Sequence, residues 1–349
     1  MSDRKVPLFF HEKYASYRFG KFHPFDPRRF PKFVEEVEKE EKMHAEVEVT
    51  ESPKADDRVL ETVHDPGYIK GVDEKEKTGG SLTMDTPVKK GSPEAARYIV
   101  GGSLEAAKMI ENEGVEFAIN LGGLHHAGPD YGEGFCMFND VAVAARYLAE
   151  QKEKVVIFDT DAHQGNGTMD IFMKDPNVLF ISIHQDPATL YPGRGYVQEV
   201  GKEEGEGFTV NIPMPRDSNL TEYHYAIEEV VKPLVRQFSP DVLIRNGGSD
   251  PHHADSLTDL ALDMRGLKYL GEVSRSMAEE GDAGYIDLML SGYGQRVLEG
   301  WKAITIGTLG VDVPLPTDQK IGDIGYEPKK KMVETVDDLK KILKEYWEF

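Results

Sequence analysis

The chain has 349 residues, of which 39% are hydrophobic and 30% are charged, a composition typical of a globular protein with one large domain or two ordinary ones. Its 62 acidic and 41 basic residues give a net charge of −21, which argues against nucleic acid as a partner, because nucleic-acid binding relies on Lys and Arg to neutralise phosphates. Such a charge would tolerate or attract a cationic substrate, and it is equally what a solvated acidic surface needs for solubility.

The first 90 residues show the least regular pattern of the chain. Residues 35–51 form a dense run of charges, which we interpret as the solvated face of a helix and not as a binding tail. From residue 93 onward, short apolar runs alternate with helical patterns. The runs predict strands at residues 116–121, 154–158, 178–183, 208–212, 241–245, 285–290 and 303–306.

Helical patterns lie between these strands. We expect helices at residues 92–112, 141–152, 221–237, 264–280 and 295–300, the first opening with Ser92-Pro93, a capping residue followed by proline. Residues 334–347 carry Val336, Leu339, Leu343 and Trp347 at helical spacing, which predicts a closing helix that docks on the rest. The continuous alternation predicts one α/β domain over residues 1–349, with a mostly parallel sheet covered by helices on both faces.

Polar clusters follow four of the predicted strands. They are His125-His126, Asp159 to His163, Asn246 to Asp250 and Ser291 to Gly294. Ligands of open α/β sheets bind beyond the carboxyl ends of the strands, where these clusters would meet. One cluster of this kind is routine, whereas four at one edge, each beside glycines, are hard to explain as structural residues alone.

The segment Asp159-Thr160-Asp161-Ala162-His163 carries the most specific chemistry. In an extended backbone the side chains of Asp159, Asp161 and His163 project to the same side. Carboxylates and an imidazole suit a catalytic divalent metal, above all zinc, with one position left open for water. Taken alone, the segment could also be an ordinary polar loop.

In these segments the chain resembles the zinc-dependent histone deacetylase family, which includes acetoin-utilisation proteins and acetylpolyamine amidohydrolases. The resemblance runs from about Tyr17 to about Trp301. It implies an arginase/deacetylase-type parallel sheet and a metal-dependent hydrolase that removes acetyl or related acyl groups from amines. Its motifs are Arg18-Phe19-Gly20-Lys21-Phe22-His23-Pro24, Val63-His64-Asp65-Pro66-Gly67-Tyr68, Gly122-Gly123-Leu124-His125-His126-Ala127, Gly134-Phe135-Cys136-Met137-Phe138-Asn139-Asp140 and Asp159 to Thr168.

The resemblance assigns roles position by position. Asp161, His163 and Asp250 match the ligands of a single Zn²⁺, with Fe²⁺ as the alternative. His125 and His126 match the histidines that hold and activate the attacking water, Asp159 matches the carboxylate behind His125, and Tyr293 matches the donor to the substrate carbonyl. The expected substrate-binding residues are a tunnel wall and its rim, formed by Gly134, Phe135, Tyr191, Leu257 and, by a looser alignment, Asp85.

The chain departs from the family pattern at several positions. Asn166 stands where some members have an aspartate behind the second histidine, and Gln164 replaces a histidine. A neutral partner stabilises imidazolium less than a carboxylate does, which favours His126 as the general base. The segment after Ser291 lacks the usual asparagine following Tyr293. His252 and His253 are atypical: they could line the pocket mouth, bind an adventitious metal or have no role.

Three alternatives bear on function. A binuclear manganese hydrolase of the arginase type would need a carboxylate two residues after His163, where Gly165 stands. A non-catalytic binding member would be expected to lack Tyr293 or a ligand, and all are present. A polyamine deacetylase would carry an acidic residue seven positions after Asp250, where Leu257 stands, so acyl-lysine is the expected substrate, although the net charge also suits cationic small molecules.

The remaining sequence features concern the cell compartment and the cysteine. No apolar run approaches the ~20 residues that span a bilayer, and the charged N-terminus lacks a signal-peptide core. We therefore expect a cytoplasmic protein with no membrane partner; its oligomeric state is open. The single cysteine, Cys136, excludes an intrachain disulfide, and its apolar neighbours predict a packed core residue and not a nucleophile.

Overall fold

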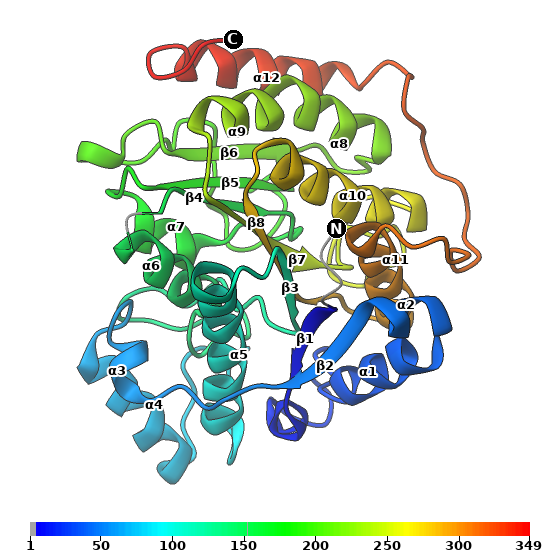
Figure 1. The fold of residues 1–349 in the computed structure, drawn as a ribbon. Coiled ribbons are helices and arrows are strands. Elements are labelled where there is room, and N and C mark those ends of the chain that lie inside the picture. The colour runs from blue at the N-terminus through cyan, green and yellow to red at the C-terminus, as the bar shows by residue number, and fades with distance from the viewer. Residues whose placement is uncertain (1–4, 152) are drawn as a thin grey trace.

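An eight-stranded, entirely parallel sheet forms the centre of the molecule, in the order β2-β1-β3-β8-β7-β4-β5-β6 (Figure 1). The computed structural model describes residues 5–151 and 153–349. All seven strand pairs are parallel, so the carboxyl ends of the strands meet at one edge. The strands are β1 (Val6–Phe10), β2 (Val47–Glu51), β3 (Phe117–Asn120), β4 (Val155–Asp159), β5 (Val178–Gln185), β6 (Thr209–Met214), β7 (Val242–Gly248) and β8 (Gly284–Ser291).

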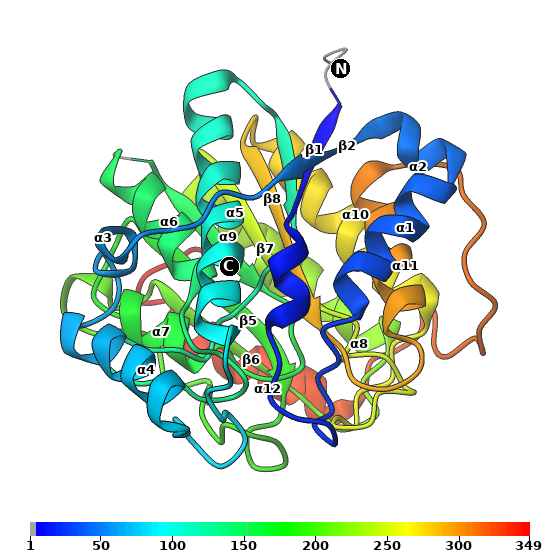
Figure 2. The ribbon, with the colours of Figure 1, turned by 90° about the horizontal axis from the view of Figure 1, so that it is seen from below.

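Helices cover both faces of this sheet. One face carries α3 (Asp57–Leu60), α4 (Pro66–Thr78), α5 (Ser92–Glu113), α6 (Asp140–Glu150) and α7 (Asn166–Phe172). The other carries α1 (Arg29–Lys39), α2 (Glu41–Glu46), α10 (Met264–Glu280) and α11 (Val297–Leu309) (Figure 2). The remaining helices are α8 (Leu220–Ala226), the π-helical turn η3 (Ile227–Val231), α9 (Lys232–Phe238), α12 (Lys330–Leu343), and the 3₁₀ turns η1 (Glu12–Ser16) and η2 (Glu203–Gly205).

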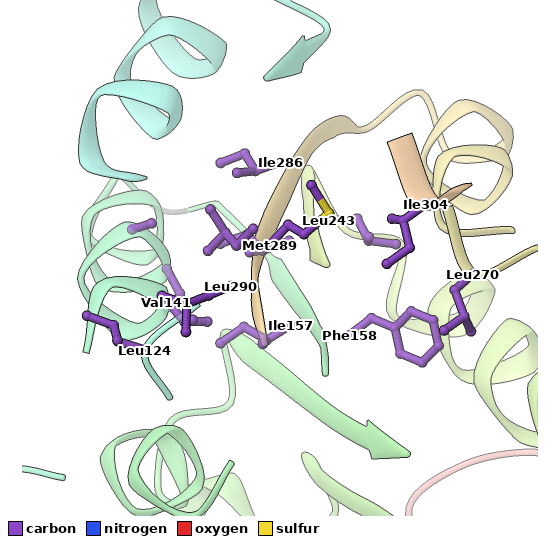
Figure 3. Close-up of a cluster of buried hydrophobic side chains, with 14 of the residues drawn as sticks. Leu124, Val141, Ile157, Phe158, Leu243, Leu270, Ile286, Met289, Leu290 and Ile304 are labelled. Atoms are coloured by element: carbon purple, nitrogen blue, oxygen red, sulfur yellow. The ribbon is translucent and has the colours of Figure 1, made fainter. Parts of the chain in front are cut away.

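Side chains alternate across β4 and bury both faces of the sheet. Ile157 points toward Val141 of α6, whereas Phe158 points the opposite way, toward Leu270 of α10 and Ile304 of α11 (Figure 3). Every residue of β4 is buried. Burial on both sides explains why the central strands are continuous apolar runs in the sequence. The predicted parallel α/β fold is confirmed.

One predicted strand is wrong. Residues 303–306 belong to α11, which continues the helix expected at residues 295–300. This helix is buried on most of its surface between the sheet and its neighbours α10 and α1, so its apolar residues show no stripe. A short apolar run cannot be assigned to helix or strand by its periodicity alone.

The N-terminal region contains two strands, β1 and β2, that the pattern analysis did not predict. The charge run at 35–51 is not one helix face: it holds the end of α1, then α2, and then β2. In β2, only Val47 is buried, and the following charged residues face solvent because this strand lies at the edge of the sheet. Charged residues on an exposed edge strand look the same in sequence as those on a helix surface.

The helix expected at 264–280 is α10 with the same bounds, and the remaining predicted helices are present with shifted ends. The helix expected at 92–112 is α5, which ends at an αL glycine, Gly114. The helix expected at 141–152 is α6, and its expected last residue lies outside the described residues. The helix at 221–237 is divided into α8, η3 and α9, and the closing helix is α12, beyond which Trp347 packs on Phe208 and Phe238.

No helix among the described residues offers an apolar stretch long enough to cross a bilayer.

Candidate metal centre and active site

Two carboxylates and one imidazole converge at the carboxyl edge of the sheet. Asp161 and His163 lie in the turn after β4, and Asp250 lies just after β7, the neighbouring strand. The Nδ1 atom of His163 is 3.1 Å from Oδ1 of Asp161 and 3.1 Å from Oδ2 of Asp250. The possible metal-binding atoms of Asp161, His163 and Asp250 all lie within 4.8 Å of one another, and all three residues are buried. The structure thus brings together the three predicted metal ligands.

The chemistry of this donor set fits a divalent cation. Burial and the neighbouring charge of Asp161 raise the pKa of Asp250 well above its ordinary value, so two adjacent buried carboxylates resist ionising together. A cation between them would remove that conflict. The oxygen, oxygen and nitrogen donors are those that zinc and ferrous iron accept, and three protein ligands leave a position for water.

His125 is held by a carboxylate. Its Nδ1 atom donates to Oδ2 of Asp159 at 2.7 Å, and the turn before it is fixed by Asp140, whose carboxylate accepts from the backbone nitrogen of Leu124 at 2.6 Å. Burial lowers the pKa of His125, but the charges of Asp159 and Asp161 outweigh burial and raise it to about 9. His125 therefore favours the imidazolium form.

His126 has a neutral partner instead. Its Nδ1 atom donates to Oδ1 of Asn166 at 2.7 Å, and the amide of Asn166 in turn donates to Glu133 at 2.6 Å. Burial, followed by the charge of His125, lowers the pKa of His126 well below its usual value. A neutral His126 with its proton on Nδ1 leaves the lone pair of Nε2 available to accept a proton.

Tyr293 and His126 both lie beside His163. The ring centroids of Tyr293 and of His126 are each 6.2 Å from that of His163. The peptide group between Gly292 and Tyr293 is held at both of its polar atoms: the nitrogen of Tyr293 donates to Asp255 at 2.6 Å, and the buried Arg29 donates to the carbonyl oxygen of Gly292 at 2.7 Å. Burial and the nearby carboxylates raise the pKa of Tyr293, so its hydroxyl keeps its proton.

Aromatic side chains line the approach to these groups. The ring of Phe135 lies 5.6 Å from Tyr293, and Tyr191 packs edge-on against His126 at 5.2 Å while remaining 39% exposed. Gly134 has a left-handed φ of 54°, and a Cβ there would lie 2.4 Å from the ring of His126. Glycine at this position therefore allows the backbone to pack closely against the imidazole of His126.

The other two predicted substrate-binding residues lie at the rim. The carboxylate of Asp85 accepts hydrogen bonds from the hydroxyls of Thr83 and Thr86, and Thr86 also accepts from the backbone nitrogen of Phe135 at 3.0 Å. Leu257 is 37% exposed and lies on the loop that binds the backbone of Tyr293. Both positions are compatible with substrate contact, and their roles stay predictions.

His252 and His253 bind a carboxylate far along the chain. Their Nε2 atoms lie 2.9 and 3.0 Å from the two oxygens of Asp318. The three side chains form a second group of metal-type donors among the described residues. Asp318, however, also accepts from Arg296 at 3.0 Å and from the backbone nitrogens of Met264 and Gln319, so its charge is already compensated. We interpret this cluster, the Asp318 clasp, as a structural hydrogen-bond network.

Cys136 is buried, and burial raises the pKa of its thiol. A thiol that stays protonated is a poor nucleophile, in line with its prediction as a core residue.

Several residues around the site escaped the sequence analysis. Glu133, Asp255 and Arg29 orient Asn166 and Tyr293, as described above. Asp255 and Glu133 lie close in sequence to predicted site residues, which was the one signal that could have pointed to them. Arg29 contacts residues 261 and 263 positions away, and only the fold makes that contact visible.

Comparisons with known proteins find relatives that cover almost the whole chain. The model of the histone deacetylase domain matches residues 23–307. A probable deacetylase of Archaeoglobus fulgidus is 32% identical over 97% of this chain and 98% of its own length. The acetoin utilization protein AcuC of Bacillus subtilis is 33% identical over 86% of this chain and 81% of its own length. The crystal structure of the HDA15 HD domain superposes with a TM-score of 0.86 at 26% identity, covering 99% of this chain and 96% of that one.

Proposed function

The chain belongs to the histone deacetylase family, and we propose that it removes an acetyl or related acyl group from the side-chain amine of lysine. One observation carries the proposal. A group that can accept a proton, His126, and a group that can donate a hydrogen bond to oxygen, Tyr293, both lie beside His163 of the buried, metal-compatible donor set. Hydrolysis of an amide needs an acceptor for the proton of the attacking water and a donor to the acyl oxygen, both within reach of the same carbonyl.

We propose that Asp161, His163 and Asp250 hold one Zn²⁺, with Fe²⁺ as the alternative. When bound there, the cation would polarise the acyl carbonyl and make water acidic enough to attack at neutral pH. A second ion of the arginase type has no matching carboxylates, because Gly165 and His252 occupy the two relevant positions.

The two histidines take different parts because their partners differ. His126, neutral through its bond to Asn166, accepts the proton of the attacking water on Nε2 and later delivers it to the leaving amine. His125, paired with Asp159, stays positively charged and orients the water by hydrogen bonding. Glu133 acts through Asn166 by fixing the direction of the amide.

Tyr293 donates its phenolic proton in a hydrogen bond to the acyl oxygen as negative charge develops there. Its high pKa keeps the donor protonated throughout the accessible pH range. Asp255 and Arg29 fix the turn, so that the hydroxyl is directed before substrate arrives.

The rim supports acyl-lysine over acetylated polyamine. A polyamine is a cation along its length and would gain from a carboxylate at the mouth, but position 257 is leucine and is exposed. The aromatic walls of Phe135 and Tyr191 suit the apolar stem of a lysine side chain. Cytoplasm, where acylated proteins and metabolites are both available, remains the expected compartment.

Hydrolysis of an acetyl-lysine peptide and of N-acetylputrescine by zinc-loaded protein, side by side, tests the proposal. We expect the peptide to be the better substrate by kcat/KM. Faster cleavage of N-acetylputrescine would move the function to small-molecule metabolism. Failure to cleave either would favour a non-catalytic binding member of the family.

A further inference from the structure

A cleft of about 940 Å³ lies beside the tunnel, between the segment after η1 and the segment before α5, both near the lower edge of Figure 2. Among its lining side chains only Asp26 is acidic. Five are cationic, namely Arg18, Lys21, Arg28, Lys89 and Lys90. In a chain with a net charge of −21, this local excess of positive charge runs against the overall balance.

Most of these cations have no acidic partner among the described residues. Arg28 pairs with Asp26 at 2.7 Å. Across the described part of the chain, no carboxylate lies within ion-pair distance of the other four, and all four are exposed. Elsewhere on the surface, lysines commonly pair with neighbouring acids, as Lys331 does with Asp186 and Lys340 with Glu229. The cleft therefore presents cationic groups that a ligand can pair with.

The cleft is joined to the tunnel wall through His23. This residue lines the cleft, its ring packs edge-on against Phe135 at 4.4 Å, and its Nε2 atom bonds the backbone oxygen of Asp85 at 3.0 Å. Phe135 in turn faces Tyr293. An extended peptide advances ~3.3–3.6 Å per residue, so residues a few positions from a lysine held in the tunnel can reach the cleft.

We propose that this cleft binds an acidic segment of the acylated protein substrate, beside the acyl-lysine. The inference rests on the proposed lysine deacylase function and names the sequence context that the enzyme prefers. Carboxylates of the substrate would pair with Arg18, Lys21, Lys89 and Lys90. Charge complementarity at the rim of an interface mainly increases encounter and selects partners. A cationic polyamine would be repelled from the same cleft.

The test compares peptides of equal length, each with one acetyl-lysine and a flank of three Glu, three Gln or three Lys residues. Each flank is placed once on the N-terminal side of the acetyl-lysine and once on its C-terminal side. The net charge alone would favour the Lys peptide. The cleft instead predicts a KM for the Glu peptide about three- to tenfold below that of the Gln peptide, because exposed ion pairs each contribute little. The values of kcat should agree, since the segment binds equally before and during the reaction. The preference should shrink at high salt.

Charge reversal identifies the cleft as the cause. In the double variant Lys89→Glu with Lys90→Glu, the KM for the Glu peptide should rise above that for the Gln peptide. The matched control, Lys341→Glu with Lys344→Glu, makes the same change of net charge at the C-terminal end of α12. This helix packs beside β6 at the other edge of the sheet, and the control should keep the Glu preference.

Affinities of the same peptides, measured by fluorescence anisotropy, separate the two proposals. Equal affinity of the wild-type protein for Glu and Gln peptides would overturn the acidic-segment proposal, as would a Glu preference that survives reversal of Lys89 and Lys90. Absence of hydrolysis with a retained preference in binding would contradict the deacylase function and leave the docking proposal supported.

Discussion

At the scale of single residues, the site depends on which group stands behind each histidine. Asp159 gives His125 a carboxylate partner, and Asn166 gives His126 an amide. The two imidazoles are neighbours in sequence and their ring centroids are 4.1 Å apart, yet their pKa values move in opposite directions. His125 can therefore stay positively charged, while His126 can accept a proton and release it again. The proposed amide hydrolysis needs both functions.

Tyr293→Phe removes one hydroxyl and keeps the ring that packs against Phe135. We expect kcat for an acetyl-lysine peptide to fall by about 10²–10³-fold with KM little changed, because the bond to the acyl oxygen strengthens in the transition state. Steady-state kinetics give both values. Tyr346→Phe, which removes an exposed hydroxyl bonded to Glu206, is the control. A loss in the Tyr293 variant below about fivefold would rule out the proposed donor role.

Residues in contiguous motifs could be predicted, and residues that act through the fold could not. The donors Asp161, His163 and Asp250 each follow a buried strand, so their meeting follows from a parallel sheet. Arg29 and Glu133 support the site through contacts that no spacing in the sequence reveals. The roles given to the site residues stay predictions until variants are measured.

At the scale of elements, hydrogen bonds attach the segment between α11 and α12 to the loop after β7 and to the residue before α11. The Asp318 clasp joins this segment, residues 310–329, to His252 and His253 on the loop after β7 and to Arg296 before α11. The same loop fixes the backbone of Tyr293 through Asp255 and Ser256. Burial raises the pKa of Asp318, but its bonds to the histidines and to backbone outweigh burial and lower it to about 2.

Asp318→Ala should lower the free energy of unfolding by about 2–4 kcal/mol, because it leaves the buried His252 without its carboxylate partner and removes one of the acceptors of Arg296. Urea denaturation measures the change. Asp312→Ala in the same segment removes an exposed carboxylate paired only with Lys42, and should cost less than ~0.5 kcal/mol. Equal effects of the two variants would show that the clasp does not hold the segment.

The elements that sequence patterns predicted well were those with one environment along their length. Strands such as β4 and β5 are buried on both faces and so are unbroken apolar runs. The pattern analysis failed where the environment overrode the pattern: α11 is apolar on most sides because it is enclosed, and β2 is charged because it lies at an edge. Propensity gives way to tertiary context at such places.

At the scale of the whole molecule, buried neutral histidines couple stability to pH. Burial lowers the pKa of His64 to about 4 and that of His184 to about 4. The unfolded chain takes up protons near pH ~6.5, whereas the folded chain does not until lower pH. Stability is therefore full above pH ~6.5 and is lost as pH falls toward ~4.

Between pH ~7.5 and ~5, each of these histidines should remove about 2 kcal/mol from the free energy of unfolding. Urea denaturation at the two pH values measures the loss in wild-type protein and in His64→Gln. The variant should show a loss smaller by about that amount, whatever its stability at the higher pH. An unchanged pH slope would show that His64 is not held neutral by the fold.

The charge of the whole molecule and the charge near the tunnel have opposite signs. A net charge of −21 describes the surface at large, while the cleft beside His23 carries five cations and one acid. Composition could not reveal this, because Arg18 and Lys89 come together only through the packing of η1 against α5. We propose that residues 1–349 act as one domain, since the site residues follow β3, β4, β7 and β8, the four middle strands of a single sheet.

Metal dependence of acetyl-lysine hydrolysis tests the central claim most directly. The protein is stripped with a chelator, assayed, and assayed again after addition of one equivalent of Zn²⁺, in parallel with His163→Ala. The account predicts that activity disappears on stripping, returns with zinc in the wild-type protein and stays absent in the variant. Full activity in the stripped protein, or in His163→Ala, would contradict a reaction centred on Asp161, His163 and Asp250.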